Sequence, residues 1–135
     1  MRVVILGCSR VGAYLTNLLI KEGHELCIID KDRSSFARLG NDCPSQMVVG
    51  LGIDEDVLRQ AGIEQADAFI AVTNGDNTNV MAAQVAKDIF GVKRVICRIY
   101  DPLRAEIYHN MVLETYCPTL LGANAIKTIL TSISE

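Results

Sequence analysis

The residues best suited to chemistry stand near the start of the chain. An apolar run at 3–6 is followed by a six-residue turn that leads into a helical pattern: Gly7, Cys8, Ser9, Arg10, Val11 and Gly12. Gly7 can adopt the backbone conformation of a tight turn, and Gly12 lets the helix pack closely on the strand. The free N–H groups of the first helical turn would then face an anion. The spacing therefore predicts a phosphate-binding turn.

Two residues of this turn modify the prediction. Ser9 stands where the pattern G-x-G-x-x-G has its middle glycine, and its small side chain carries a hydroxyl that can donate to a phosphate oxygen. Arg10 opposes the helix dipole, at a cost of roughly 0.3–1 kcal/mol when exposed. With a phosphate bound there, Arg10 would stabilise the helix start instead of destabilising it. The alternative is a solvated arginine that points into water.

A carboxylate follows at the distance expected for a ribose contact. Asp30 lies 18 residues beyond Gly12 (30 − 12), close to the roughly 20-residue spacing of dinucleotide-binding folds. Its charge would repel a 2′-phosphate, which favours NAD or another adenine nucleotide over NADP, although Lys31 and Arg33 soften that preference. Alternatively, Asp30 caps the next helix, a role that Asp32 could also fill.

Apolar runs alternate with helical patterns along the whole chain. The runs are typical of buried parallel strands, and we expect six of them, at 3–6, 26–30, 46–49, 66–72, 95–99 and 113–116. A helical pattern follows the turn at 7–12, and further helices are expected at 34–39, 54–61, 80–90, from 101, and at 119–134. This alternation predicts an α/β fold, a Rossmann-like doubly wound parallel sheet in the order 3-2-1-4-5-6. Residues 1–118 would form the lobe and residues 119–135 a separate C-terminal helix.

Ligands in such sheets bind where the strand order reverses, here between strands one and four. The polar exit of the fourth strand begins with Thr73 and Asn74, which we expect near the ligand. In the alternative, Asp76 or Asn77 caps the long helix and the rest is solvated loop. Arg98 interrupts the fifth strand and needs a partner, because a buried unpaired charge is expensive. A ligand phosphate, a neighbouring subunit or a carboxylate could serve, and an intrachain salt bridge is the commonest outcome.

The last helix is apolar around more than one stripe. Its hydrophobic positions are Leu120, Leu121, Ala123, Ala125, Ile126, Ile129, Leu130 and Ile133. We expect this surface to be too broad for one sheet face, so that a subunit partner or a following segment covers the remainder.

Composition narrows the class of protein. Of 135 residues, 50% are hydrophobic and 21% are charged, which indicates a folded domain, and the net charge of −3 argues against nucleic-acid binding. The apolar runs, about six residues long, predict neither a membrane span nor a signal peptide. Five scattered cysteines without a CxxC pair favour a reducing cytoplasm, and two histidines supply too few ligands to predict a metal site.

With these residues in place, the sequence resembles the nucleotide-binding lobe of the RCK or KTN domain. That domain occurs in regulatory subunits of Trk and Ktr potassium transporters and in gating rings of potassium channels. The resemblance rests on the turn at 7–12, on Gly-His-Glu at 23–25 before Ile-Asp at 29–30, and on Ala-Gly-Ile-Glu at 61–64 before Ala-Asp-Ala at 66–68. It also rests on Ala-Val-Thr-Asn at 71–74 and Tyr-Asp-Pro-Leu-Arg-Ala at 100–105.

The resemblance implies a regulatory module rather than an enzyme. Such a lobe binds NAD(H) or ATP/ADP without turning it over and forms a homodimer partly through its last helix. It assembles further as a tetramer or octameric ring beneath a membrane potassium transporter or channel subunit, at the cytoplasmic face of the membrane. By position, the resemblance places the phosphates at Gly7, Ser9, Arg10 and Gly12, the ribose at Asp30, and Thr73 and Asn74 near the ligand.

Two departures from the family pattern concern the ligand. Ser9 stands where the family usually has glycine, and Leu51, between Gly50 and Gly52, stands where it commonly has an acid near the adenine. Leu51 can pack against adenine but cannot accept a hydrogen bond from its amino group. With Cys8, Val11, Lys31 and Arg98, these residues complete the predicted binding site. In the family a second, regulatory lobe follows the last helix, so we expect this chain to be a fragment or a short subunit.

Two enzymatic alternatives share the glycine turn and the ribose acid. One is the cofactor domain of an NAD-dependent dehydrogenase, which would need a second domain and a proton-transfer residue near the substrate. Neither His24 nor His109 follows the carboxyl end of a predicted strand. The other is a methyltransferase-like fold, against which only the family resemblance argues.

Overall fold

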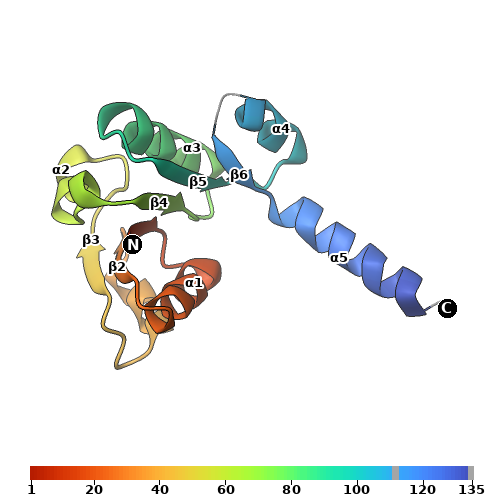
Figure 1. Cartoon of the computed structure of the whole chain (residues 1–135), viewed down its shortest axis with the longest axis horizontal. Coiled ribbons are helices and arrows are strands. Elements are labelled where there is room, and N and C mark those ends of the chain that lie inside the picture. Colours follow the sequence, from red (N-terminus) through yellow and green to blue (C-terminus); the bar gives the residue numbers. More distant parts are fainter. Residues whose placement is uncertain (111–112, 134–135) are drawn as a thin grey trace.

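The computed structural model describes residues 1–110 and 113–133, with no account of the side chains of Asn110 and Ile133. Its centre is a parallel sheet of six strands in the order β3-β2-β1-β4-β5-β6, which confirms the predicted fold class (Figure 1). The strands are β1 (Arg2–Leu6), β2 (Glu25–Asp30), β3 (Gln46–Val49), β4 (Ala68–Ala71), β5 (Arg94–Arg98) and β6 (Glu114–Tyr116). β3 has the expected bounds, and the bounds of the other strands differ from the expected ones by one or two residues at one or both ends.

Helical segments connect these strands. They are α1 (Arg10–Lys21), the 3₁₀ turns η1 (Arg33–Leu39) and η2 (Ile63–Gln65), α2 (Glu55–Gln60), α3 (Asp76–Gln84) with its π-helical continuation η3 (Val85–Ile89), α4 (Pro102–Asn110) and α5 (Pro118–Ile133). Asp54 caps α2 by accepting a hydrogen bond from the N–H of Asp56. The expected helix at 80–90 begins earlier, at Asp76, and the expected helix end at Ser134 lies outside the described residues.

Alternate strand residues point to two hydrophobic layers. Ile5 and Ile28 face the side covered by α1 and η1, where Phe36 and Leu39 pack against them. Val4 and Ile29 face the opposite side, together with residues of α2 and α3. Since both faces of the central strands are buried, these strands carry continuous apolar runs, at 3–6 in β1 and 26–29 in β2, rather than apolar residues at alternate positions. Figure 1 shows the two helical layers on either side of the sheet.

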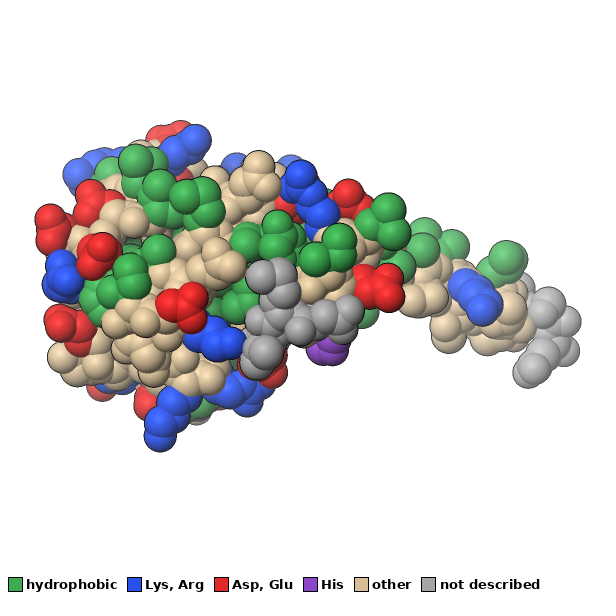
Figure 2. All heavy atoms as spheres, turned by 90° about the horizontal axis from the view of Figure 1, so that it is seen from above, with side chains coloured by type: hydrophobic (Ala, Val, Ile, Leu, Met, Phe, Trp, Pro, Cys, Tyr) green, Lys and Arg blue, Asp and Glu red, His purple; other side chains and the backbone are tan. Residues whose placement is uncertain are grey.

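The last helix does not cover the sheet. From Thr119 to Ser132 every side chain of α5 is exposed, including Ile126 and Leu130, which are 68% and 67% accessible. The expectation that α5 buries part of its surface on one sheet face is therefore wrong within the described chain. The helix leaves the edge strand β6 and projects away from the body (Figure 1), and hydrophobic side chains lie along this projection in Figure 2.

No helix in the described part of the chain is both long enough and apolar enough to span a membrane.

Candidate functional site

A cleft of about 660 Å³ opens at the carboxyl ends of β1 and β4, where the strand order reverses. Every residue of the predicted binding site except Gly12 lines it: Gly7, Cys8, Ser9, Arg10, Val11, Asp30, Lys31, Leu51, Thr73, Asn74 and Arg98. The parallel order brings these segments together, because the strands on which they stand all end at one edge of the sheet.

The turn after β1 depends on its two glycines. Gly7 has a φ of +105°, and a side chain there would approach the backbone of Val72 and Thr73 to 2.9 Å. A Cβ on Gly12 would lie 2.0 Å from the carbonyl oxygen of Gly7. Gly12 therefore lies beneath the cleft and sets the close approach of α1 to the turn, as its spacing predicts.

The first turn of α1 points N–H groups into the cleft mouth. Ser9 is the N-cap, and its Oγ accepts from the Gly12 N–H at 3.2 Å while donating to the Val72 carbonyl at 2.9 Å. In this structure the serine proton is therefore directed at the Val72 carbonyl, and donation to a phosphate stays a prediction. The N–H groups of Arg10 and Val11 donate to no other described residue, so they remain open to an anion.

Asp30 ties the glycine turn to the end of β2. Its Oδ2 accepts from the Cys8 N–H and its Oδ1 from the Asp32 N–H, each at 2.8 Å. The interpretation of Asp30 as the cap of the next helix is wrong, because Asp32 caps η1 and accepts from the Ser34 N–H. Each Asp30 oxygen keeps a second lone pair, so the carboxylate can still accept hydrogen bonds from ribose hydroxyls.

Cys8 contributes the wall of the turn rather than a donor to a ligand. Its N–H is held by Asp30, its thiol donates to the Ser35 carbonyl, and its own carbonyl accepts from Arg38 at 3.0 Å. Burial, and then the negative charge of Asp30, raise the pKa of the Cys8 thiol to about 11. The thiol therefore stays neutral, and it packs as a small apolar group.

The exit of β4 is organised by Asn79, a residue that the sequence did not single out. Its buried side chain accepts from the N–H and hydroxyl of Thr73 and donates to the carbonyls of Thr73 and Arg98. Thr73 therefore lines the cleft with its hydroxyl turned inward. The alternative that Asp76 or Asn77 caps α3 is wrong, since Gly75 holds the cap position without a side-chain bond.

Arg98 is 3% exposed and has no carboxylate partner among the described residues. Its Nη2 donates to the Val72 carbonyl at 2.7 Å and to the Thr73 carbonyl at 2.9 Å, with a longer contact to Asn74. Its Nε is buried without a partner. The expected intrachain salt bridge is therefore absent from the described chain, and a positive charge stands uncompensated at the cleft wall.

Tyr100 and Arg38 also line the cleft, and sequence reasoning missed both. The ring of Tyr100 lies over the guanidinium of Arg98, with 4.8 Å between Cζ and the ring centroid. Tyr100 follows β5 and Arg38 lies in the short η1, and no periodicity or spacing in the sequence identifies either residue as part of a binding site. The motif at 100–105 contained Tyr100 without assigning it a contact.

The far end of the cleft is shaped by the loop after β3. Leu51 is 58% exposed there, and a Cβ on the neighbouring Gly52 would meet the Leu6 side chain at 2.2 Å. Gly52 thus allows the loop to close over the end of β1, and Leu51 presents an apolar surface beside Asp30 and Lys31.

Within residues 1–110 and 113–133, no three His, Cys, Asp or Glu side chains are placed to hold a metal ion together.

Known proteins share the sequence pattern and the fold of this chain. Residues 3–116 match the model of the TrkA-N domain family. The Trk system potassium uptake protein TrkA of Streptomyces coelicolor is 50% identical over 115 residues, which are 85% of this chain and 52% of that protein. A TrkA homolog of Methanothermobacter thermautotrophicus is 28% identical over 132 residues, 97% of this chain and 61% of the homolog. The chain thus spans 52–61% of the length of these two relatives.

Solved structures with the same fold include nucleotide complexes. The Kef C-terminal domain of Shewanella denitrificans in its AMP-bound form has a TM-score of 0.84 at 22% identity, covering 100% of this chain and 83% of that one. The GsuK RCK domain has a TM-score of 0.84 at 21% identity, covering 99% and 29%. GsuK bound to ADP has a TM-score of 0.82 at 24% identity, covering 96% and 33%.

Proposed function

Because the chain belongs to the TrkA-N domain family, we propose that it is a regulatory lobe of a potassium uptake system that binds an adenine nucleotide in the cleft. The ligand is NAD(H) or ATP/ADP, bound without being turned over. Nucleotide state then biases the conformation of a membrane transporter or channel subunit.

The observation that carries this proposal is the buried, uncompensated guanidinium of Arg98. A charge that is 3% exposed and lacks a described carboxylate partner is expensive unless an anion meets it. Across the cleft, the free N–H groups of Arg10 and Val11 add the positive end of the α1 dipole. Both groups therefore favour phosphate, and a neighbour of the same fold was solved in an AMP-bound form.

The rest of the cleft suits an adenosine. Asp30 offers carboxylate oxygens at the turn, where the ribose hydroxyls of a nucleotide lie in this fold. Leu51 offers an apolar surface on which an adenine can pack. Lys31 also lines the cleft.

Regulation requires a ligand that distinguishes two conformations of an assembly. The exposed apolar surface of α5 is suited to a homodimer, which would pack the projecting helices of two copies against each other. Further assembly as a tetramer or octamer would place the lobes at the inner face of the membrane, beneath a potassium transporter partner.

Nothing specific favours the dehydrogenase alternative. His24 accepts from or donates to the N-terminal amine at 2.9 Å, at the opposite end of the sheet, and His109 stands on α4. Neither lines the cleft.

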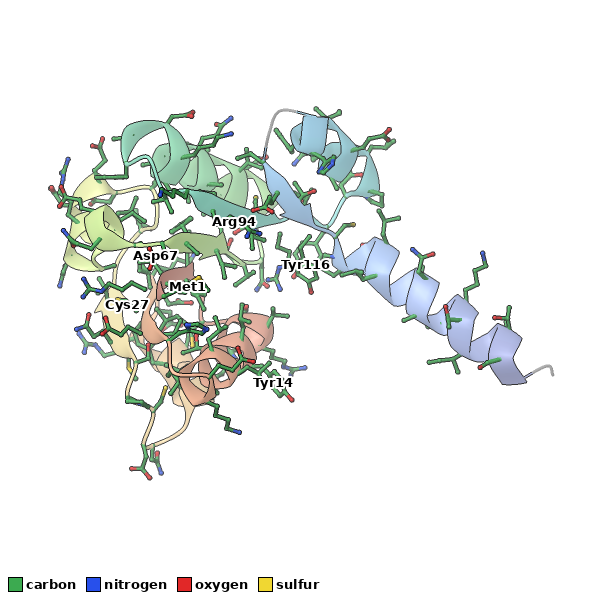
Figure 3. All side chains as sticks on the ribbon, viewed as in Figure 1. Met1, Tyr14, Cys27, Asp67, Arg94 and Tyr116 are labelled. Atoms are coloured by element: carbon green, nitrogen blue, oxygen red, sulfur yellow. The ribbon has the colours of Figure 1, made fainter. Side chains whose placement is uncertain are left out.

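A pair of matched charge removals tests the site. Asp30→Asn should weaken ADP binding by at least ~1.5 kcal/mol, the lower range for a hydrogen bond to a charged group, in calorimetric titration. Asp67→Asn removes the same charge at the amino end of the sheet, where Asp67 accepts from the Arg2 N–H, and should leave ADP affinity unchanged (Figure 3). Equal affinities for the two variants would remove Asp30 from the site.

A further inference from the structure

Tyr100 joins three parts of the lobe at the end of the cleft. Its ring covers the Arg98 guanidinium at 4.8 Å, which is within the range of a cation–π contact. Its N–H donates to the Asp76 carboxylate at 2.9 Å, at the start of α3. Its carbonyl accepts from the Thr119 hydroxyl at 2.8 Å, in the first turn of α5.

The hydrogen bond from the Thr119 hydroxyl to the Tyr100 carbonyl connects α5 to the body of the lobe. It joins the first turn of α5 to the residue that follows β5, whereas the hydroxyls of Thr128 and Ser132 bond to carbonyls within the helix. The thiol of Cys117, just before the helix, also points to the Tyr100 carbonyl at 3.6 Å. Figure 3 marks the neighbouring Tyr116 at the end of β6, where the chain turns into the projecting helix.

We propose that Tyr100 is a positioning residue that couples occupancy of the nucleotide cleft to the setting of α5. The proposal rests on the proposed function and names the residues through which a ligand phosphate at Arg98 changes the position of α5. The ring holds the guanidinium on one side, and the same residue's backbone carbonyl anchors the base of the helix.

The coupling follows from a rearrangement that Arg98 is free to make. The Val72 carbonyl also accepts from Ser9, and the Thr73 carbonyl also accepts from Asn79, so neither loses its last donor when the guanidinium turns toward a phosphate. The Tyr100 ring, stacked on the guanidinium, moves with it, and the carbonyl of the same residue carries the shift to Thr119. By linkage, whatever holds α5 in its ligand-bound setting strengthens nucleotide binding by the same factor.

The test separates the contributions of the Tyr100 ring and of the Thr119 hydroxyl, with the response of α5 as the readout. We would titrate the 135-residue chain with ADP by calorimetry and follow hydrogen exchange of the amides at 119–123, with and without saturating ADP. Tyr100→Leu removes the ring, Tyr100→Phe keeps it, and Thr119→Val removes the anchoring hydroxyl. Thr128→Val is the matched control, because the Thr128 hydroxyl bonds within α5 to the Asn124 carbonyl.

In the unaltered chain, in Tyr100→Phe and in Thr128→Val, ADP should slow exchange at 119–123 at least about threefold. Tyr100→Leu should bind ADP about tenfold more weakly, because the ring no longer orients the guanidinium toward the phosphate. Tenfold is about 1.4 kcal/mol, within the range of a partly desolvated cation–π contact. Thr119→Val should bind ADP within about twofold of the unaltered chain, yet show no ADP-dependent change at 119–123.

Two results would overturn the coupling: an unaltered response in Thr119→Val, or unaltered ADP affinity in Tyr100→Leu. ADP binding by the unaltered chain without any response at 119–123 would overturn the coupling while leaving the proposed function intact. Absence of binding of ADP and of NADH alike by the unaltered chain would overturn both.

Discussion

Replacing Arg98 by methionine should separate ligand binding from folding. Methionine keeps most of the side-chain stem and removes the charge. The two carbonyls that Arg98 contacts keep their other donors, Ser9 and Asn79, and the exposed Asn74 side chain can bond to water, so the substitution leaves no buried acceptor unpaired. It also leaves no buried carboxylate without a partner in the described chain, which is the usual reason why breaking a buried ion pair costs about 3–5 kcal/mol.

The remaining terms nearly cancel. Loss of the contact with the Tyr100 ring costs about 1–2 kcal/mol, and removal of the buried, unpaired Nε returns about 1–3 kcal/mol. The lost hydrogen bonds to the Val72 and Thr73 carbonyls are offset by no longer burying a charge. The free energy of unfolding of the ligand-free chain, measured in urea, should therefore change by no more than about 1 kcal/mol. ADP affinity should fall about 10- to 150-fold, which corresponds to a charged hydrogen bond of about 1.5–3 kcal/mol.

Adenosine provides the control ligand, because it lacks the phosphates and should bind Arg98→Met and the unaltered chain equally. A loss of 3 kcal/mol or more in unfolding free energy, with ADP affinity retained, would refute the reasoning. Arg98 would then be a structural residue.

Three further predictions concern the turn, the thiols and the last helix. Gly12→Ala should destabilise the chain by about 1–3 kcal/mol in urea, because its Cβ would meet the Gly7 carbonyl oxygen, whereas Gly122→Ala, in open helix, should stabilise it by about 0.5–1 kcal/mol; equal effects would refute the packing argument. Cys43 should react first with a thiol reagent in the folded chain, since the other four cysteines are buried, and prior labelling of another cysteine, located by peptide mapping, would contradict this. Ile126→Asp should give a folded monomer in sedimentation if α5 forms the dimer, and a persisting dimer would exclude this face.

The fold could be predicted because its signals are local. Buried strands such as 3–6 are continuous apolar runs, and the close approach at Gly7 and Gly12 is a matter of spacing within six residues. Strand order then followed from the alternation of strands and helices, and it placed Thr73 and Asn74 opposite the turn without any contact being known.

The hydrogen-bond pattern of the site could not be predicted in the same way. Asn79 and Tyr100 act through partners that tertiary packing brings to them. Asn79 bonds to the Arg98 carbonyl, 19 residues away, and Tyr100 bonds to Thr119, also 19 residues away. Arg98 was expected to find a carboxylate on statistical grounds, but in the described chain it meets carbonyls and a ring. The projection of α5 also depends on geometry, because an apolar pattern gives no information on which surface will cover it.

The most direct test of the central claim is a crystal structure of this chain grown with ADP. The account predicts the phosphates between the first turn of α1 and Arg98, the ribose on Asp30, and the adenine against Leu51. ADP bound elsewhere, or an unoccupied cleft at saturating ADP, would contradict it.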